Sequence, residues 1–584
     1  MADYRPQIQQ LARAHQYRLH PFALKRLSDF LAEARPNEGD GQNLLRDLFT
    51  LLQKQTSAST NAQDRFVDLD RINGIISLQV SKMKGVYQHE SGPAVQVVSL
   101  KEVPRTYIDP NAEEVRVQYP EGSPFFSPSS TLSTSDGPGG QVGAWRQRYR
   151  LCRRRCLRSG IYRKEIKSNA AHLGEEFLPL LVTSSLEGMG AQQQVAVLGL
   201  LVQRGEGFLL EDLRGQVKIE FELDSDPGRS VADPSVFVGT GFLVVAKGFF
   251  ENSVFRVRRV ELPPVERREA VLADVGPIDL FGLGPQDLTA THTIEKAAVQ
   301  SVILFLAHVH LDKPRTMQHL QFFFQRMQER SEAELADTTF VLIGNFCSTP
   351  LRPAAVSHLP DVFDEADGLR VLFDQLAQCI VTHCPTGATH SHFILIPGPE
   401  DGTSLQGFLP QPPLPASVLK NFRSRVRKVS LAPNPARLRF CTHEIVVCRR
   451  EFLHDLQAAD TAFAESVKGA TSGSNSAGRP LHSSLENFNP STSTSASFER
   501  VAKTVVDSAH LVPDARGVTK VLWPLDHTLS LPALPHTLLL CDSTEPWECF
   551  YKDSHVINPG SFAVSTSFLW YTPSDGECNL SNVE

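Results

Sequence analysis

The spacing of apolar and polar residues along the chain predicts helices near the N-terminus. Two apolar stripes at helical spacing occur within residues 6–55, and the loop sequence 37–41 separates them. The first stripe contains Leu24, Leu27 and Leu31. This pattern indicates a small N-terminal helical domain within residues 1–75.

The pattern changes to short β-rich runs between residues 193 and 262. Five runs rich in β-branched and aromatic residues follow one another there, and glycine-containing turns separate them. They span residues 195–202, 208–212, 217–221, 242–248 and 254–257. Five strands of this length predict a small β-barrel, and an OB-fold is the expected form.

From about residue 300 onward, apolar runs alternate with helical segments such as 317–330 and 369–382. This alternation predicts a layered α/β arrangement. Residues 468–497 interrupt it with Ser, Thr, Asn and Gly, which predicts a disordered surface insertion. The whole pattern is that of a multidomain α+β protein, with the OB-fold region at 145–275 and the α/β domain at 276–584.

Composition also predicts a tether between the first two modules. Residues 110–144 are rich in Pro, Ser, Thr and Gly, so they cannot bury enough apolar surface to offset the entropy lost on ordering. Only residues 75–80 nearby are apolar enough to form a short strand. We therefore predict a flexible linker over residues 76–144.

Seven arginines occur within the 13 residues 146–158, directly after this linker. They indicate either a basic helix that contacts nucleic acid or a helix whose arginines pair with acidic neighbours or a partner subunit. No aromatic stacking pattern accompanies the charge, which favours the second interpretation. The candidate contact residues are Arg146, Arg148, Arg150, Arg153, Arg154 and Arg155.

Length and composition limit the functional classes. A chain of 584 residues exceeds the size of one core, so three or four domains are expected. Because the formal net charge is −7, any contact with nucleic acid needs a local basic patch. The ten cysteines form no C-x-x-C knuckle, which indicates free thiols in a reducing compartment. Neither a signal-peptide core nor an apolar stretch of 18 residues occurs, so a soluble intracellular protein is expected.

Four of the apolar runs in the α/β region end in short polar tips. These segments are residues 304–310, 341–346, 394–401 and 540–544. In α/β folds, ligands bind just outside the carboxyl ends of strands, so the four tips are candidates for one site. The tip residues of interest are His308, His310, Asn345, Pro399, Glu400, Asp542 and Thr544.

The four tips resemble those of calcineurin-like phosphoesterases, which read Asp-x-His, Gly-Asp, Gly-Asn-His-Asp/Glu and Gly-His-x-His and hold two metal ions. Here the neutral Asn345 replaces the bridging carboxylate that two adjacent dications require. Pro399 and Glu400 replace the Asn-His pair, and Asp542 and Thr544 stand in place of two histidines. The resemblance implies a calcineurin-like α/β sandwich that binds no metal or cofactor and is not an enzyme.

The order of the modules resembles a second, larger family. A helical domain, a linker, an OB-fold and an inactive phosphoesterase are similar to the B-subunits of replicative DNA polymerases. Segments 340–350, 393–401, 434–447 and 556–562 most resemble the B-subunits of DNA polymerase epsilon.

This resemblance implies a nuclear, non-catalytic scaffold subunit that acts in DNA replication. Its OB-fold and phosphoesterase domains would bind the cysteine-rich C-terminal domain of the catalytic subunit. Its helical domain would bind GINS in the replicative helicase. The small histone-fold subunits would be indirect partners, and a DNA contact is compatible with this role.

Three other interpretations stay open. The chain resembles the B-subunits of polymerases alpha and delta less closely, and a delta subunit would not need the helical domain. A working metallophosphoesterase conflicts with Asn345, and a lone residual metal ion would have His310, His308 and Asp542 as its candidate ligands. A single-stranded nucleic-acid binder would use residues 193–262 together with the arginines, and its binding would depend strongly on salt.

Overall fold

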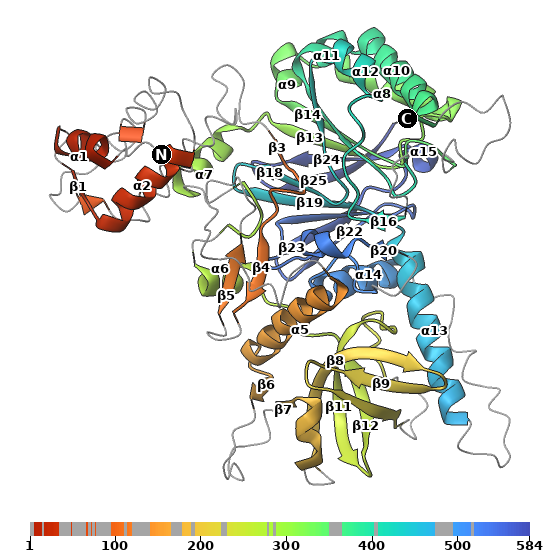
Figure 1. Cartoon of the computed structure of the whole chain (residues 1–584). Helices are drawn as coiled ribbons and strands as arrows, with labels where there is room; N and C mark the ends of the chain where they lie inside the picture. The colour runs from red at the N-terminus through yellow and green to blue at the C-terminus, as the bar shows by residue number, and fades with distance from the viewer. Residues whose placement is uncertain are drawn as a thin grey trace.

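Three modules follow one another in the computed structural model: an N-terminal pair of helices, a β-barrel and an α/β sandwich (Figure 1). None of the described helices combines the length and apolar character needed to cross a membrane. The structure describes residues 5–14, 17–33, 48–49, 66–67, 72, 76, 95–109, 114–118, 140–164, 178–188, 193–222, 231–276, 279–283, 288–349, 365–401, 407–472, 494–514 and 519–583.

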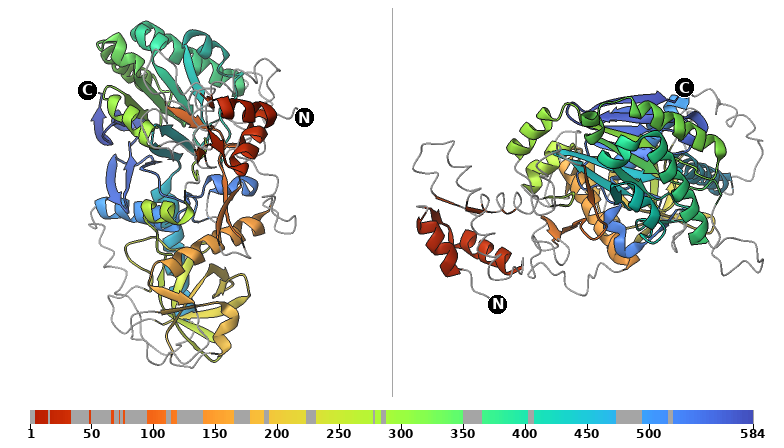
Figure 2. Two further views of the ribbon diagram at one scale, coloured as in Figure 1. Left: turned by 90° about the vertical axis from the view of Figure 1, so that its left-hand side faces the viewer. Right: turned by 90° about the horizontal axis from the view of Figure 1, so that it is seen from above.

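The N-terminal helices are α1 (Arg5–Ala14) and α2 (Pro21–Glu33). Between them β1 (Arg18–Leu19) pairs in parallel with β2 (Phe66–Val67). Leu27 of the first predicted stripe is buried in the core of this module. Seen from above, the two helices stand apart from the other described elements (Figure 2). That they form an independent domain stays a prediction.

All five predicted strands of the barrel are present. They are β8 (Val195–Arg204), β9 (Gly207–Glu211), β10 (Gln216–Phe221), β11 (Leu243–Glu251) and β12 (Val254–Glu261). Pairing of β8 with β11 closes the sheet, and β7 (Leu178–Leu181) and β6 (Tyr162–Lys164) extend it. Gly248 lies at a bulge, where an added Cβ would be 1.9 Å from the carbonyl oxygen of Arg256.

The C-terminal module consists of two six-stranded sheets packed face to face. The first sheet has the order β17 (Lys428–Leu431), β15 (His392–Ile396), β14 (Thr338–Ile343), β13 (Val302–Leu306), β24 (Ser567–Thr572) and β25 (Glu577–Asn582). The second has the order β22 (Trp547–Tyr551), β23 (Ser554–Asn558), β21 (Thr537–Cys541), β19 (His443–Arg449), β18 (Ala436–Phe440) and β3 (Gln96–Val98). Between the sheets, Phe305, Val341 and Ile394 pack in one core with Val447 and Leu539.

Helices cover the outer faces of both sheets. Over the first sheet lie α8 (Pro314–Gln328), α9 (Glu332–Ala336), α10 (Glu365–His383), α11 (Pro385–His390) and α12 (Lys420–Arg425), at the top of Figure 1. The helical segments predicted at 317–330 and 369–382 correspond to α8 and α10. On the second sheet lies α14 (Thr494–Ser508). Helix α13 (Phe452–Ser472) begins beside it and runs along the barrel, where Phe463 packs against Phe208 (Figure 1). The insertion predicted at 468–497 falls mostly outside the described residues.

Shorter elements connect these layers. They are η4 (Thr183–Gly188), α6 (Arg268–Val275), α7 (Leu288–Ala297), β16 (Phe408–Leu409), β20 (Lys520–Val521), η6 (Trp523–Thr528) and α15 (Phe562–Ser565).

The range predicted as a flexible linker, 76–144, contains ordered strands. β3 pairs antiparallel with β18, and β4 (Arg105–Ile108) pairs with β5 (Val115–Gln118). The side chains of Val98 and Val103 are buried in the core beneath the second sheet. The predicted linker was therefore too wide. Short β-rich runs gain their stability from a distant sheet edge, which local composition does not reveal.

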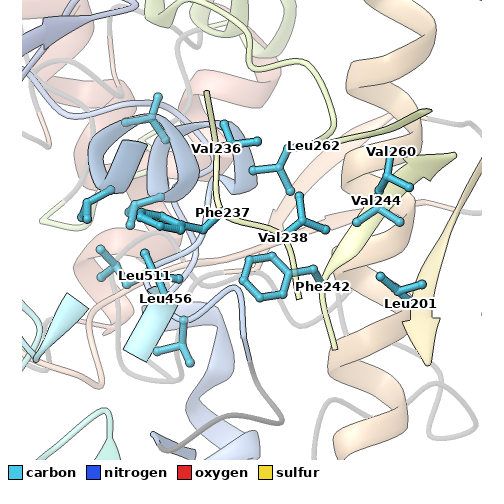
Figure 3. Packing of buried hydrophobic residues seen from close by; sticks show 14 of the residues in the cluster. Leu201, Val236, Phe237, Val238, Phe242, Val244, Val260, Leu262, Leu456 and Leu511 are labelled. Atoms are coloured by element: carbon cyan, nitrogen blue, oxygen red, sulfur yellow. The ribbon is translucent and has the colours of Figure 1, made fainter. Parts of the chain in front are cut away.

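One hydrophobic core joins the barrel to the sandwich. Phe237 and Phe242, which precede β11, belong to the same cluster as Leu456 of α13 and Leu511, which follows α14 (Figure 3). The backbone amide of Phe237 also donates to Oγ1 of Thr504 at 2.8 Å. Because apolar packing is continuous across the joint, the two modules form one rigid unit.

Candidate functional site

The four polar tips meet at one place in the sandwich. Three of them follow the parallel neighbours β13, β14 and β15, so they lie at the same edge of the first sheet. The fourth follows β21 in the second sheet. The tips of the two sheets lie against each other. His308 of the first tip interacts with the backbone of Asp542 and with the charges of Arg449 and Glu451 in the second sheet.

The two histidines of the first tip are uncharged. His308 is buried, and its Nε2 has no hydrogen-bond partner among the described residues. Burial, and next the charge of Arg449, holds the pKa of His308 well below its ordinary value. His310 is half-buried with its ring 6.2 Å from that of His308, and burial lowers its pKa as well. Both rings are therefore neutral at pH 7.

The second and third tips are tied to each other by amide hydrogen bonds. Nδ2 of Asn345 donates to the Glu400 carboxylate at 3.2 Å, and the Glu400 amide donates back to Oδ1 of Asn345 at 3.3 Å. The carbonyl oxygen of Pro399 accepts from the amide of Gly407 at 3.0 Å and from Nε2 of Gln411 at 3.2 Å. These contacts hold loops together at the positions where the phosphoesterase resemblance expects metal and substrate groups.

Asp542 and Thr544 of the fourth tip also make structural contacts. The Asp542 carboxylate accepts from the amide of Leu453 at 2.8 Å, in the first turn of α13, and from the amide of Thr544 at 3.2 Å. Nδ2 of Asn558 donates to Oγ1 of Thr544 at 3.0 Å. The Asp542 carboxyl therefore caps the N-terminus of α13. Burial raises its pKa to about 6.

Two charged residues at the site were not among the predicted positions. Nη2 of Arg449 donates to Oε1 of Glu451 at 2.7 Å, and Oγ of Ser543 donates to Oε2 of Glu451 at 2.6 Å. Burial alone would raise the pKa of Glu451, but Arg449 and Ser543 hold it at about 2. The signal in the sequence is a charged run that begins with Arg449, the last residue of β19, and it matches no metal-ligand spacing. A guanidinium therefore lies beside the histidines of the first tip.

Asp401 lies in the third tip and has no exposed surface. Its Oδ1 accepts from the amide of Phe346 at 2.6 Å, and its Oδ2 accepts from the amide of Gly398 at 2.7 Å. Burial raises its pKa to about 7. A Cβ added to Gly344 would lie 1.9 Å from Oδ2, so this close approach requires glycine. Asp401 thereby links the second and third tips.

Over the part of the chain that the structure describes, no group of three or more His, Cys, Asp and Glu side chains could hold a metal ion. What the tips offer is a set of hydrogen bonds that fixes the strand ends of both sheets.

The predicted basic helix is α5 (Gln141–Arg158), which lies between the barrel and the sandwich (Figure 1). Arg148 is buried, and its Nε and Nη2 donate to the two carboxylate oxygens of Asp526, with the Nε distance at 3.1 Å. Its Nη1 donates to the carbonyl oxygen of Val512 at 3.2 Å. Arg155 is also buried and donates to a backbone carbonyl of the sandwich at 3.3 Å. Two of the six candidate arginines are thus inside the protein.

The other candidate arginines lie nearer the surface. Arg154 pairs with Asp274 of α6 at 2.5 Å, and Arg158 pairs with the same carboxylate. Arg146 is exposed, while Arg150 and Arg153 are half-buried. Acidic neighbours and backbone carbonyls of this chain therefore engage Arg148, Arg154 and Arg155.

Two regions of the chain match the models of known protein families. Residues 303–549 match the family described as the B-subunit of DNA polymerases alpha and epsilon, and residues 140–264 match the OB-fold domain described as DNA polymerase epsilon subunit 2-like. Both regions are thus similar to B-subunits of DNA polymerase epsilon. The predicted OB-fold and the predicted resemblance to these subunits are both confirmed.

Relatives in this family match most of the chain. The DNA polymerase epsilon B-subunit of Arabidopsis thaliana is 26% identical over 99% of this chain and 98% of its own length. DNA polymerase epsilon subunit 2 of Homo sapiens is 27% identical over 75% of this chain and 75% of its own length. The Saccharomyces cerevisiae B-subunit is 26% identical over 65% of this chain and 58% of its own length.

Proposed function

We propose that the chain is a non-catalytic accessory subunit of DNA polymerase epsilon in the nucleus, and that barrel and sandwich together bind the cysteine-rich C-terminal domain of the catalytic subunit. The observation that carries this proposal is the core shared by the two modules around Phe237, Leu456 and Leu511. A rigid two-module surface loses little conformational entropy when a partner binds across it. The names of the matching relatives support the polymerase assignment.

The proposal also accounts for the site in the sandwich. We infer that this module is a calcineurin-like frame whose metal-ligand positions now serve folding. Asn345 and Glu400 bind each other, and Asp542 caps α13. A protein that hydrolyses nothing needs its strand tips only for such contacts.

The N-terminal helices would provide the second attachment point. Amphipathic α1 and α2 bury one face in their own small core. By resemblance to the family, this module would bind GINS in the replicative helicase, and the histone-fold subunits would join through the catalytic subunit. Two modest contacts on one chain gain affinity from effective concentration.

Capture of the catalytic subunit tests the proposal. The full chain is co-expressed with the C-terminal domains of the epsilon, delta and alpha catalytic subunits and purified at high salt. We expect stable capture of the epsilon domain alone. Capture of none or of all three, or a manganese-dependent phosphodiesterase activity in the purified chain, would contradict the proposal.

Two matched substitutions locate the binding platform. Phe237 in the shared core and Phe323 beneath the helical layer are both 1% exposed. Phe237→Ala is expected to weaken capture of the epsilon domain more than Phe323→Ala, because only the first loosens the joint between the modules. Equal effects would show that general destabilisation, not the joint, governs binding.

A further inference from the structure

A second basic segment, residues 420–428, presents its charges at the surface. It reads Lys-Asn-Phe-Arg-Ser-Arg-Val-Arg-Lys and spans α12 and the first residue of β17. Five of its nine residues are lysine or arginine. It lies in the helical layer that covers the first sheet, on the far side of the sandwich from the barrel (Figure 1).

Apolar anchors hold this segment in place. Phe422 and Val426 have no exposed surface, and the ring of Phe422 packs edge-on against Phe373 of α10 at 6.0 Å. The residues between the anchors point outward. The exposed basic side chains are Lys420, Arg423, Arg425 and Arg427, and Lys428 is half-buried.

The positive charges of this basic patch, Lys420 to Lys428, are uncompensated. In the described parts of the chain, none of its five cations forms an ion pair, and Arg425 donates only to the neutral amide oxygen of Gln378 at 3.0 Å. One carboxylate, that of Asp374, lies alongside and accepts from Asn421 at 2.9 Å.

Four exposed cations of the barrel show the contrast. Each of these four lies within ion-pair distance of a neighbouring carboxylate: Lys218, Arg256, Arg258 and Arg259. The basic patch therefore retains a local positive charge in a chain whose formal net charge is −7.

We propose that the basic patch contacts the phosphate backbone of DNA. Lysine and arginine side chains neutralise phosphates and release counterions, which supplies affinity without reading the base sequence. Because Phe422 and Val426 already fix the segment, little backbone entropy is lost on binding. The choice of DNA over an acidic protein segment rests on the proposed function, since the partner polymerase works on DNA.

Salt-dependent binding of the full chain tests this surface. A labelled DNA duplex of about 30 base pairs is titrated with protein, and fluorescence anisotropy is followed between about 50 and 200 mM salt, the range over which phosphate contacts weaken most clearly. The patch variant is K420Q/R423Q/R425Q/R427Q. The control variant K218Q/R256Q/R258Q/R259Q removes the same charge from the barrel.

The patch variant should bind DNA at least ~100-fold more weakly, with the slope of log K against log salt smaller by about 3 to 4, because each phosphate contact contributes about 0.9. The control should bind within about threefold of the unchanged protein, since its cations are already paired. Equal weakening of both variants, or no binding by the unchanged protein, would overturn the proposal.

Capture of the epsilon C-terminal domain is measured on the same variants. If the patch variant captures the epsilon domain normally and its DNA binding is unaltered, the proposed DNA contact of the patch is refuted and the accessory role still stands. Unaltered DNA binding with lost capture would assign the surface to an acidic protein and also overturn the proposal. If the fourfold variant unfolds, R423Q/R425Q and K420Q/R427Q are measured separately, and each should lower the slope by about half as much.

Discussion

The buried pair of Arg148 and Asp526 fastens α5 to the sandwich, and its removal should have a measurable cost. Arg148 donates to both carboxylate oxygens, and the two side chains are 9% and 8% exposed. The rings of Trp145 and Trp523 lie 4.9 and 5.7 Å from the guanidinium carbon. Arg148→Met keeps most of this apolar packing but leaves the carboxylate buried without its cation. Breaking such a pair costs about 3–5 kcal/mol.

The pH dependence of this cost has a definite sign. Burial alone would raise the pKa of Asp526, but Arg148 and His510 hold it far below its ordinary value of 3.8. A carboxyl with a depressed pKa stabilises the fold above its unfolded-state pKa, and this stability is lost as pH falls through the folded-state pKa. In Arg148→Met the buried carboxyl favours its protonated form instead. The deficit of the variant should therefore shrink as pH falls from 7 to 5.

Hydrogen exchange of the α5 amides measures the effect locally. A loss of about 3 kcal/mol corresponds to roughly 150-fold faster exchange. Adding Asp526→Asn removes the stranded charge and should restore part of the protection. The control is Arg154→Met, whose pair with Asp274 is about one-quarter exposed and should be worth less than about 1 kcal/mol. Exchange of Arg148→Met within threefold of the unchanged protein would refute the reasoning.

Three further substitutions follow from the packing. Phe237→Ala should cost about 3–5 kcal/mol and expose amides of the barrel and of α14 together, because one core serves both; exchange confined to one module would contradict this. Asp401→Asn removes one of the two side-chain oxygens that accept hydrogen bonds from backbone amides, at a cost of about 1–3 kcal/mol. Burial raises the pKa of Asp401 to about 7. The stability that this carboxyl contributes is therefore full below about pH 4 and is lost as pH rises through 7. In urea unfolding, Asp401→Asn should lose more unfolding free energy at pH 5 than at pH 8. Gly248→Ala should lower the melting temperature of the barrel, since the new Cβ would meet the Arg256 carbonyl at 1.9 Å. Gly207→Ala, whose nearest contact would be at 3.8 Å, is its control and should melt normally.

Much of the sandwich could be predicted because buried parallel strands read as continuous apolar runs. The four runs before the tips are β13, β14, β15 and β21, and the tips do meet at one site. Arg449 and Glu451 could not be assigned to that site, because they enter it from β19 across the space between two sheets. Their approach depends on sheet packing, which no spacing along the chain encodes.

Charge density along the sequence was a poor guide to charge at the surface. The arginines of α5 find carboxylates that are distant in sequence: Asp526 lies 378 positions from Arg148, and Asp274 lies 120 positions from Arg154. The basic patch after Lys420 is less conspicuous, yet no described carboxylate pairs with it. Whether a cation is available to a partner is decided by tertiary contacts.

The pairing of β3 with β18 limits the distance over which the N-terminal helices can act. Ile76 belongs to the core of those helices, and Val95 is buried beside the sandwich, so only 19 peptide units join the two modules. Fully extended, they cover about 65 Å, whereas a tether running to residue 144 would cover about 230 Å. The helices, and any molecule bound to them, therefore stay within about 65 Å of the point where the chain joins the sandwich. A strand of three residues thus sets the reach of the N-terminal module.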